Sequence, residues 1–85
     1  MEVQREAEAK VASAVRPLVY DLLPPTQRPA DDDDLFAYGL TSLQSVEIVL
    51  KLEEAFGVSI PEDLIVGETL STIRGMAAAV ASCLP

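Results

Sequence analysis

The sequence has 85 residues, the size of one small domain. Its 14 Asp and Glu residues outnumber its 6 Lys and Arg residues, and the formal net charge is −8. Because this charge repels phosphate backbones and anionic headgroups, we expect neither nucleic-acid nor membrane-surface binding. The chain has no His and one Cys. It therefore lacks the ligands for a structural zinc site, the partner for an internal disulfide, and a Ser-His or Cys-His catalytic pair.

The first ten residues are charged where an export signal would be apolar, and no apolar run approaches the ~20 residues of a membrane span. Cys83 lies two residues before the last residue of the sequence, and we expect it to be a reduced, unpaired thiol. These features predict a cytoplasmic protein.

The first predicted helix extends from Glu2 to Leu23. One apolar stripe follows it at intervals of 4, 3 and 4 residues, formed by Val11, Val15, Leu18 and Leu22. Pro17 lies inside this segment, and a proline within a helix costs roughly 3 kcal/mol. We therefore expect the helix to kink or to restart at Pro17.

A loop is predicted for residues 24–41, because three prolines near its start oppose regular structure. Its acidic run, Asp31–Asp34, suggests a calcium loop at first sight. An EF-hand beginning at Asp31 would need Gly at its sixth position and Glu at its twelfth, where this sequence has Phe36 and Ser42. We interpret the run as a solvated acidic loop and predict no metal site.

The most apolar helix is predicted from Ser42 to Phe56. A core stripe is formed by Ile48, Val49, Leu52 and Phe56, and a second strip by Leu43, Val46 and Leu50. Because a small domain can bury only one stripe per helix, we expect the second strip to be exposed. The alternative is that it packs under the preceding loop.

The segment after this helix contains several end signals. Gly57 is placed to end the helix as a C-cap. Pro61 suits the first position of a short helix, which Gly67 would end.

Ser71 or Thr72 is then expected to cap a last helix that ends near Leu84. The order is long helix, long loop, helix, short helix, helix, with no strand alternation. It predicts an all-α fold, a small four-helix bundle of three longer helices and one short helix, as a single domain over residues 1–85.

Ser42 lies at a chemically interesting position. The string Thr41-Ser42-Leu43-Gln44 fits a capping box, with Thr41 as the N-cap and Gln44 three residues later. A phosphoester on Ser42 would lie where free backbone N–H groups and the positive helix end favour an anion. Spacing alone favours the simpler interpretation, in which these residues only cap a helix.

A longer string around Ser42 is more specific. The residues DLFAYGLTSL at positions 34–43 resemble the modification site of the acyl carrier protein family, D-L-x-x-x-G-x-D-S-L. The strings VEIV at 46–49, LEEAFG at 52–57 and IP at 60–61 continue the family's pattern in register. The resemblance defines a carrier-like core of about residues 11–82, with the loop 24–41 leading to the modification site.

The resemblance implies a carrier without catalytic activity, with an acyl-carrier-protein-like bundle. Its Ser42 would receive a 4′-phosphopantetheine arm from coenzyme A, and the arm's thiol would hold acyl or aminoacyl groups as thioesters. In this family partner enzymes read the helix that follows the serine. Carried over by position, the apolar contacts are Leu43, Val46 and Leu50, and the polar contacts are Gln44, Glu47 and Glu54.

The expected partners are a phosphopantetheinyl transferase, a ligase that loads the acyl or aminoacyl group, and downstream synthase or transferase enzymes. Acidic residues around the site would steer this carrier, which we expect to be a monomer, toward basic patches on those enzymes.

Thr41 departs from the family pattern, which has Asp before the serine. Thr preserves the helix cap but removes a charge that helps to recruit the modifying transferase. A transferase specialised for fatty acid synthesis is therefore expected to act poorly, and a broad-specificity transferase is the expected partner. The string GLTS is also similar to stand-alone carriers that receive amino acids from dedicated adenylating ligases. Thr41 thus favours a specialised biosynthetic pathway.

Two other functions compete with a discrete carrier. The chain could be an unmodified helical adaptor that keeps the carrier fold only for protein binding. It could also be an enzyme in its own right, but its base would then be a carboxylate, and no motif places one beside Ser42. Modification of Ser42 distinguishes the carrier from the unmodified adaptor. Hydrolysis of model esters that survives Ser42→Ala would count against a serine nucleophile.

Overall fold

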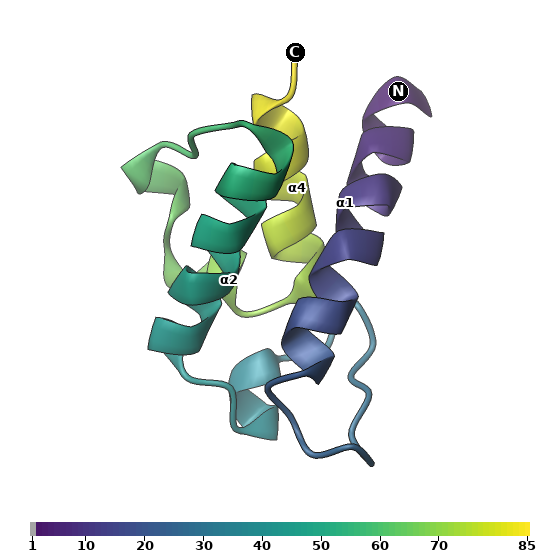
Figure 1. Cartoon of the computed structure of the whole chain (residues 1–85), viewed down its shortest axis with the longest axis vertical. Helices are drawn as coiled ribbons and strands as arrows, with labels where there is room; N and C mark the ends of the chain where they lie inside the picture. The colour runs from purple at the N-terminus through teal and green to yellow at the C-terminus, as the bar shows by residue number, and fades with distance from the viewer. Residues whose placement is uncertain (1) are drawn as a thin grey trace.

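The computed structural model describes residues 2–85, with side chains described from Arg5 onward. Four helices and two 3₁₀ turns follow one another along the chain (Figure 1): α1 (Glu2–Tyr20), η1 (Leu35–Tyr38), α2 (Ser42–Phe56), η2 (Glu62–Leu64), α3 (Gly67–Leu70) and α4 (Ile73–Cys83). The predicted all-α bundle of three longer helices and one short helix is confirmed. Within the described residues, none of the helices is long and apolar enough to cross a bilayer.

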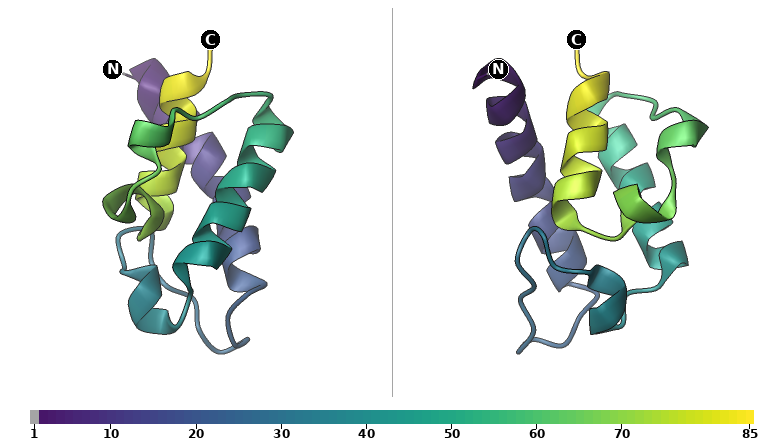
Figure 2. Two further views of the ribbon diagram at one scale, coloured as in Figure 1. Left: turned by 90° about the vertical axis from the view of Figure 1, so that its left-hand side faces the viewer. Right: turned by 180° about the vertical axis from the view of Figure 1, so that it is seen from behind.

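The helices α1 and α4 lie side by side and form the larger part of the core (Figures 1 and 2). From α1, Val11, Val15 and Val19 are each fully buried. From α4, the buried residues are Ile73, Met76, Ala77, Ala79, Val80 and Ala81. Apolar side chains on facing sides of two helices exclude water together, and this burial is the main favourable contribution to the fold.

The predicted stripe of α1 is wrong in its second half. Leu18 is only partly buried and Leu22 is 39% exposed, whereas Val19 and Leu23 are buried. Leu18 and Leu22 lie at helical spacing from Val15, and so do Val19 and Leu23. The sequence pattern alone therefore does not show which of the two pairs is buried. The position of α4 decides which apolar face is covered.

Pro17 does not interrupt α1, which continues to Tyr20. The predicted restart is therefore wrong, and the helix ends three residues before the predicted Leu23. Pro17 and Ser13 are both exposed, so the Ser13 carbonyl that loses its helical partner can hydrogen-bond to water. The Asp21 N–H still donates to the Pro17 carbonyl at 3.0 Å, which continues the turn past the proline.

The predicted helix boundaries at and after the end of α2 are confirmed only in part. Gly57 has φ +66° and its N–H donates to the Glu53 carbonyl, as predicted for a C-cap. Pro61 precedes a single 3₁₀ turn, η2, rather than an α-helix. The prediction for Gly67 is wrong, because Gly67 begins α3 instead of ending a helix. The turn η2 ends with the Ile65 N–H donating to the Glu62 carbonyl. The next helix, α3, therefore begins after Val66, at Gly67.

The last helix begins as predicted. Thr72 is its N-cap, and the Thr72 Oγ1 accepts a hydrogen bond from the Gly75 N–H at 2.8 Å. Cys83 is the last residue of α4 and is a free cysteine.

Candidate functional site

Ser42 is the first residue of α2, and its side chain is exposed. Thr41 before it is the N-cap, with extended backbone. The Thr41 Oγ1 accepts the Gln44 N–H at 3.1 Å, and the Gln44 Oε1 accepts the Thr41 N–H at 2.9 Å. This is the predicted capping box. It fixes the first turn of α2 in one conformation and therefore fixes the direction in which Ser42 faces solvent.

The first turn of α2 suits an anion attached to Ser42. The turn contains no acidic side chain. The backbone N–H groups of Ser42 and Leu43 have no hydrogen-bond partner within the described part of the chain. Unsatisfied N–H groups and the helix dipole together favour negative charge at this end of a helix. The residues present therefore fit a phosphate-linked group on the Ser42 hydroxyl.

Buried side chains and backbone hydrogen bonds hold the loop before α2 in place, and this loop leads to Ser42. Leu35 is fully buried, and its N–H donates to the Ser71 carbonyl at 2.7 Å. Gly39 ends η1 with φ +99°, a conformation that glycine adopts without a steric penalty. Leu40 is buried, and its N–H donates back to the Leu35 carbonyl at 3.2 Å. Two buried leucines, Leu35 at the start of η1 and Leu40 just after its end, thus hold the loop next to the start of α2.

The outer face of α2 carries the exposed apolar strip that the sequence predicts. Leu43 is 68% exposed and Leu50 is 57% exposed, and Val46 is partly buried between them. The alternative, burial of the strip under the preceding loop, is wrong for the two leucines. The inner face of α2 buries Ile48, Val49 and Leu52, while Phe56 is partly buried.

The three polar residues carried over from the resemblance differ from one another. Glu47 and Glu54 are exposed, and their spacing from Leu43 and Leu50 places all four on one helical strip. Gln44 is partly buried, and its Oε1 is occupied by the capping box. The structure therefore gives Gln44 a role in forming the site as well as a place beside it.

One residue beside the site was not predicted. Ser45 is fully buried, and its Oγ has no hydrogen-bond partner in the described structure. It lies three residues before Ile48, and this spacing places it on the buried face. The sequence did contain a signal for its burial, because Ser45 lies at helical spacing from the apolar residues of the buried stripe.

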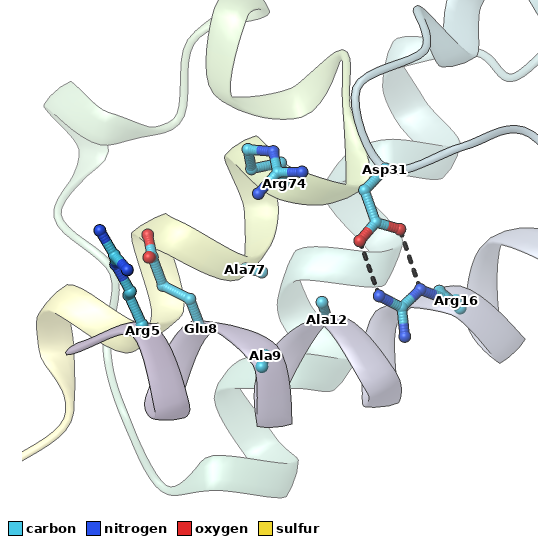
Figure 3. A pocket seen from close by; sticks show the side chains of 8 residues that line it. All are labelled: Arg5, Glu8, Ala9, Ala12, Arg16, Asp31, Arg74 and Ala77. Atoms are coloured by element: carbon cyan, nitrogen blue, oxygen red, sulfur yellow. Dashed lines mark hydrogen bonds and ion pairs between the residues drawn. The ribbon is translucent and has the colours of Figure 1, made fainter. Parts of the chain in front are cut away.

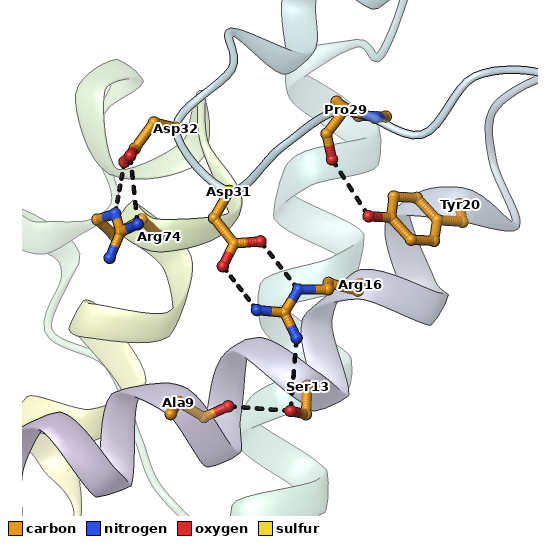
Figure 4. Close-up of polar contacts among 8 residues, drawn as sticks. All are labelled: Ala9, Ser13, Arg16, Tyr20, Pro29, Asp31, Asp32 and Arg74. Atoms are coloured by element: carbon orange, nitrogen blue, oxygen red, sulfur yellow. Dashed lines mark hydrogen bonds and ion pairs between the residues drawn. The ribbon is translucent and has the colours of Figure 1, made fainter.

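The run Asp31–Asp34 lies in a loop with Asp32 and Asp34 exposed, as predicted, but each of its carboxylates is bonded to another group, which was not predicted. Asp31 forms a bidentate ion pair with Arg16 of α1, with N–O distances of 2.9 and 2.6 Å (Figure 4). The hydrogen bond from Arg16 holds the pKa of the Asp31 carboxyl below its usual value. Asp32 pairs with Arg74 of α4, with an Nη2–Oδ2 distance of 3.2 Å.

The other two aspartates of the run bind within the loop. The Asp33 Oδ2 accepts hydrogen bonds from the Ala30 N–H at 2.8 Å and from the Tyr38 hydroxyl at 3.1 Å. The Asp34 Oδ1 accepts the Phe36 N–H at 3.0 Å and caps η1. The hydrogen bond to Asp33 raises the pKa of Tyr38. Each carboxylate of the run therefore has a structural partner.

A groove between α1 and α4 is separate from this site. It has a volume of about 400 Å³, an alanine floor and charged walls (Figure 3). No residue of α2 lines it; its lining residues are Arg5, Glu8, Ala9, Ala12, Arg16, Asp31, Arg74 and Ala77.

A helical bundle with an exposed serine at the capped start of α2 fits a carrier domain. The family described as "Phosphopantetheine attachment site" matches residues 13–80 of this chain, and the chain belongs to that family. The chain is a non-catalytic carrier domain of the kind that bears a 4′-phosphopantetheine prosthetic group. In carrier proteins a phosphopantetheinyl transferase attaches this group. The resemblance seen in the sequence is confirmed.

Among curated proteins, the chain is similar to the "Aminoacyl carrier protein" of Agrobacterium fabrum (strain C58 / ATCC 33970). The two are 36% identical over 52 residues, which cover 61% of this chain and 63% of that protein. The chain thus spans less than two thirds of the relative's length. No solved structure matches the chain.

Proposed function

We propose that Ser42 is the attachment residue for 4′-phosphopantetheine. The observation that carries this proposal is the exposed Ser42 hydroxyl beside two unpartnered N–H groups at the capped start of α2. The other serines within the matched residues are less suitable. Ser13 and Ser71 donate their hydroxyls to backbone carbonyls, and Ser45 is buried. Ser59 is exposed, but it lies between α2 and η2 rather than at a helix start.

Loading of Ser42 is a phosphoryl-group transfer. A bond forms between Ser42 Oγ and a phosphorus of coenzyme A, the pyrophosphate bond breaks, and adenosine 3′,5′-bisphosphate leaves; a base on the transferase takes the Ser42 proton. The bound group supplies a thiol that holds the cargo as a thioester. The chain itself contributes the N–H groups of Ser42 and Leu43, which would stabilise the negative charge of a phosphate attached to Ser42.

The face of α2 is the proposed docking surface for partner enzymes. It combines the exposed leucines with acidic side chains, so it offers apolar contact area together with charge that steers basic partners. We assign to it Thr41, Leu43, Gln44, Val46, Glu47, Leu50 and Glu54. Beyond the transferase, its proposed partners are a loading ligase and downstream synthase or transferase enzymes. A monomeric carrier in the cytoplasm remains our prediction.

The cargo is an acyl or aminoacyl group in a specialised biosynthetic pathway, and two observations favour an aminoacyl group. The relative from Agrobacterium fabrum is named an aminoacyl carrier protein. The neutral Thr41 occupies the position where the fatty acid carriers that this chain resembles have Asp. A dedicated adenylating ligase would then load the arm.

A loading assay tests the role of Ser42. The protein is incubated with a broad-specificity phosphopantetheinyl transferase and coenzyme A, and its intact mass is measured. We expect one added phosphopantetheine, absent in Ser42→Ala and retained in Ser59→Ala, which removes an exposed serine hydroxyl that does not lie at a helix start. No addition to the natural sequence, or addition to Ser42→Ala, would contradict the proposal. The former result would support the unmodified adaptor.

The cargo is tested on protein purified intact from its own cells. Cysteamine releases a thioester-bound group as its amide, and the mass of that product identifies the group. An amino acid derivative supports the aminoacyl proposal, whereas a fatty acyl or polyketide product contradicts it.

A further inference from the structure

Two consecutive aspartates connect the loop before Ser42 to two different helices. Asp31 pairs with Arg16 of α1, and Asp32 pairs with Arg74 at the start of α4 (Figure 4). The partners are 15 and 42 residues away in the sequence. We call these two ion pairs the ionic clamp.

Backbone hydrogen bonds hold the same stretch of loop. The Arg74 N–H donates to the Asp31 carbonyl at 3.0 Å, and the Leu35 N–H donates to the Ser71 carbonyl at 2.7 Å. The loop therefore runs beside the junction of α3 and α4 and is attached to it on both sides of the acidic run.

Apolar burial contributes little to this part of the loop. Between Leu23 and Leu35, Pro29 is the buried residue, and the other residues are exposed or partly exposed. A segment with so little buried apolar area depends on polar contacts for its order. Both ion pairs thus act on a stretch whose other attachments are also polar, among them the Tyr20 hydroxyl, which donates to the Pro29 carbonyl at 3.1 Å.

The stretch held by the clamp leads directly to the site. It continues into the buried Leu35, then through η1 to the buried Leu40 and the cap residue Thr41. Loss of the clamp would remove the side-chain attachments of Asp31 and Asp32 to α1 and α4 and weaken the contact of the loop with both helices. The loop would then spend part of its time in conformations in which the start of α2 is less well ordered.

We propose that the ionic clamp positions Ser42 for the transferase that modifies it, so that Arg16, Asp31, Arg74 and Asp32 are positioning residues. This inference rests on the proposed role of Ser42. If only the ordered loop is recognised, the apparent affinity for the transferase falls with the ordered fraction, while the rate of the bound complex does not change.

The two pairs are expected to contribute unequally. Both pairs are bidentate, but the side chains of Arg16 and Asp31 are only 38% and 23% exposed. Those of Arg74 and Asp32 are 64% and 72% exposed, so water weakens their attraction more. The Arg16–Asp31 pair should dominate.

The test measures steady-state loading by one transferase at saturating coenzyme A, with amide hydrogen exchange on the same proteins. The variants are Arg16→Gln, Asp31→Asn, their double variant, and Arg74→Gln. Matched controls are Lys10→Gln and Asp21→Asn, which make the same charge changes on α1 and in the loop. Neither Lys10 nor Asp21 forms an ion pair with the described side chains.

We expect KM for the carrier to rise about two- to fivefold in Arg16→Gln and Asp31→Asn, with kcat unchanged. The double variant should be no worse than the single variants, because each removes the same interaction. Arg74→Gln should give a smaller rise, and the controls none. The amides of Leu35 and Arg74 should exchange faster in the clamp variants.

Three results would contradict the proposal that the ionic clamp positions Ser42. Faster exchange without a change in KM would show a merely structural role. A higher KM in Asp31→Asn with unchanged exchange and no effect of Arg16→Gln would show direct contact of Asp31 with the transferase. Unchanged exchange and kinetics would show that the pairs do not order the loop. Failure of the natural sequence to load at all would instead overturn the proposed role of Ser42, and would remove the clamp's positioning role with it.

Discussion

The helices α4 and α2 are both rich in apolar residues, but the structure uses those residues differently. α4 buries nearly every apolar side chain against α1 and its neighbours. α2 buries one face and leaves Leu43 and Leu50 largely exposed. Exposing a leucine forgoes roughly 1.5–3 kcal/mol of burial. Folding does not account for this arrangement, and an exposed apolar strip beside Ser42 is better explained as a surface for partner proteins.

The largest expected effect is a difference in stability between variants of α4 and variants of α2. Met76 of α4 is fully buried, so Met76→Ala should lower the free energy of unfolding by about 2–5 kcal/mol. Leu50→Ala removes a side chain of similar size from α2, but its effect should lie within about 0.5 kcal/mol. Urea unfolding followed by circular dichroism measures both. Equal losses would contradict the difference between the helices.

The second prediction concerns docking. Leu50→Ala should raise KM for the phosphopantetheinyl transferase about fivefold or more, because truncation of an anchoring apolar contact costs about 1 kcal/mol or more of binding. Lys51→Gln, at the exposed neighbouring position, removes a basic side chain and should not weaken docking through apolar contacts. An unchanged KM in Leu50→Ala would show that the strip does not bind this enzyme.

The third prediction concerns the start of α2. Thr41→Ala removes the side chain that accepts the Gln44 N–H and should destabilise the protein by about 1 kcal/mol. Thr41→Asp keeps a capping oxygen, so its stability should change less. If charge at this position selects the transferase, Thr41→Asp should also improve loading by an enzyme specialised for fatty acid synthesis. A loss of stability in Thr41→Asp as large as in Thr41→Ala would refute the capping role.

The smallest expected effect is a pH dependence on the α1–α4 side. Arg16 lowers the pKa of Asp31, so this pair adds stability at pH values above the ordinary Asp pKa of about 4. That stability should be lost as the pH falls through the lowered pKa of Asp31. Unfolding measured between neutral and acidic pH should show a weaker acid dependence in Asp31→Asn than in Asp21→Asn. Identical dependences would show that the pair does not couple proton binding to folding.

The caps and the extent of α2 could be predicted from the sequence because they depend on neighbours in the chain. The capping box joins Thr41 to Gln44, and the Thr72 cap joins Thr72 to Gly75. Hydrogen bonds over three residues form with little loop-closure entropy, and their residue types are specific. The same local signals, together with the string around Ser42, identified the family.

The acidic run shows where local reasoning failed. Asp31 and Asp32 find their partners on α1 and α4, far away in the sequence. Four adjacent carboxylates have the composition of a solvated loop, and no pattern within residues 31–34 indicates the distant arginines. The assembled bundle is needed to bring these charges together.

The sequence by itself determined the order of the helices, the caps of α2 and the N-cap of α4, and the position of Ser42, because these depend on side chains and backbone within one helical turn. The tertiary structure decided which of two nearly equivalent faces is buried, placing Val19 and Leu23 inside instead of Leu18 and Leu22. It also made Ser45 part of the core and joined the loop to two helices. These outcomes depend on where neighbouring helices lie, since burial and ion pairing between distant segments arise only when those segments pack.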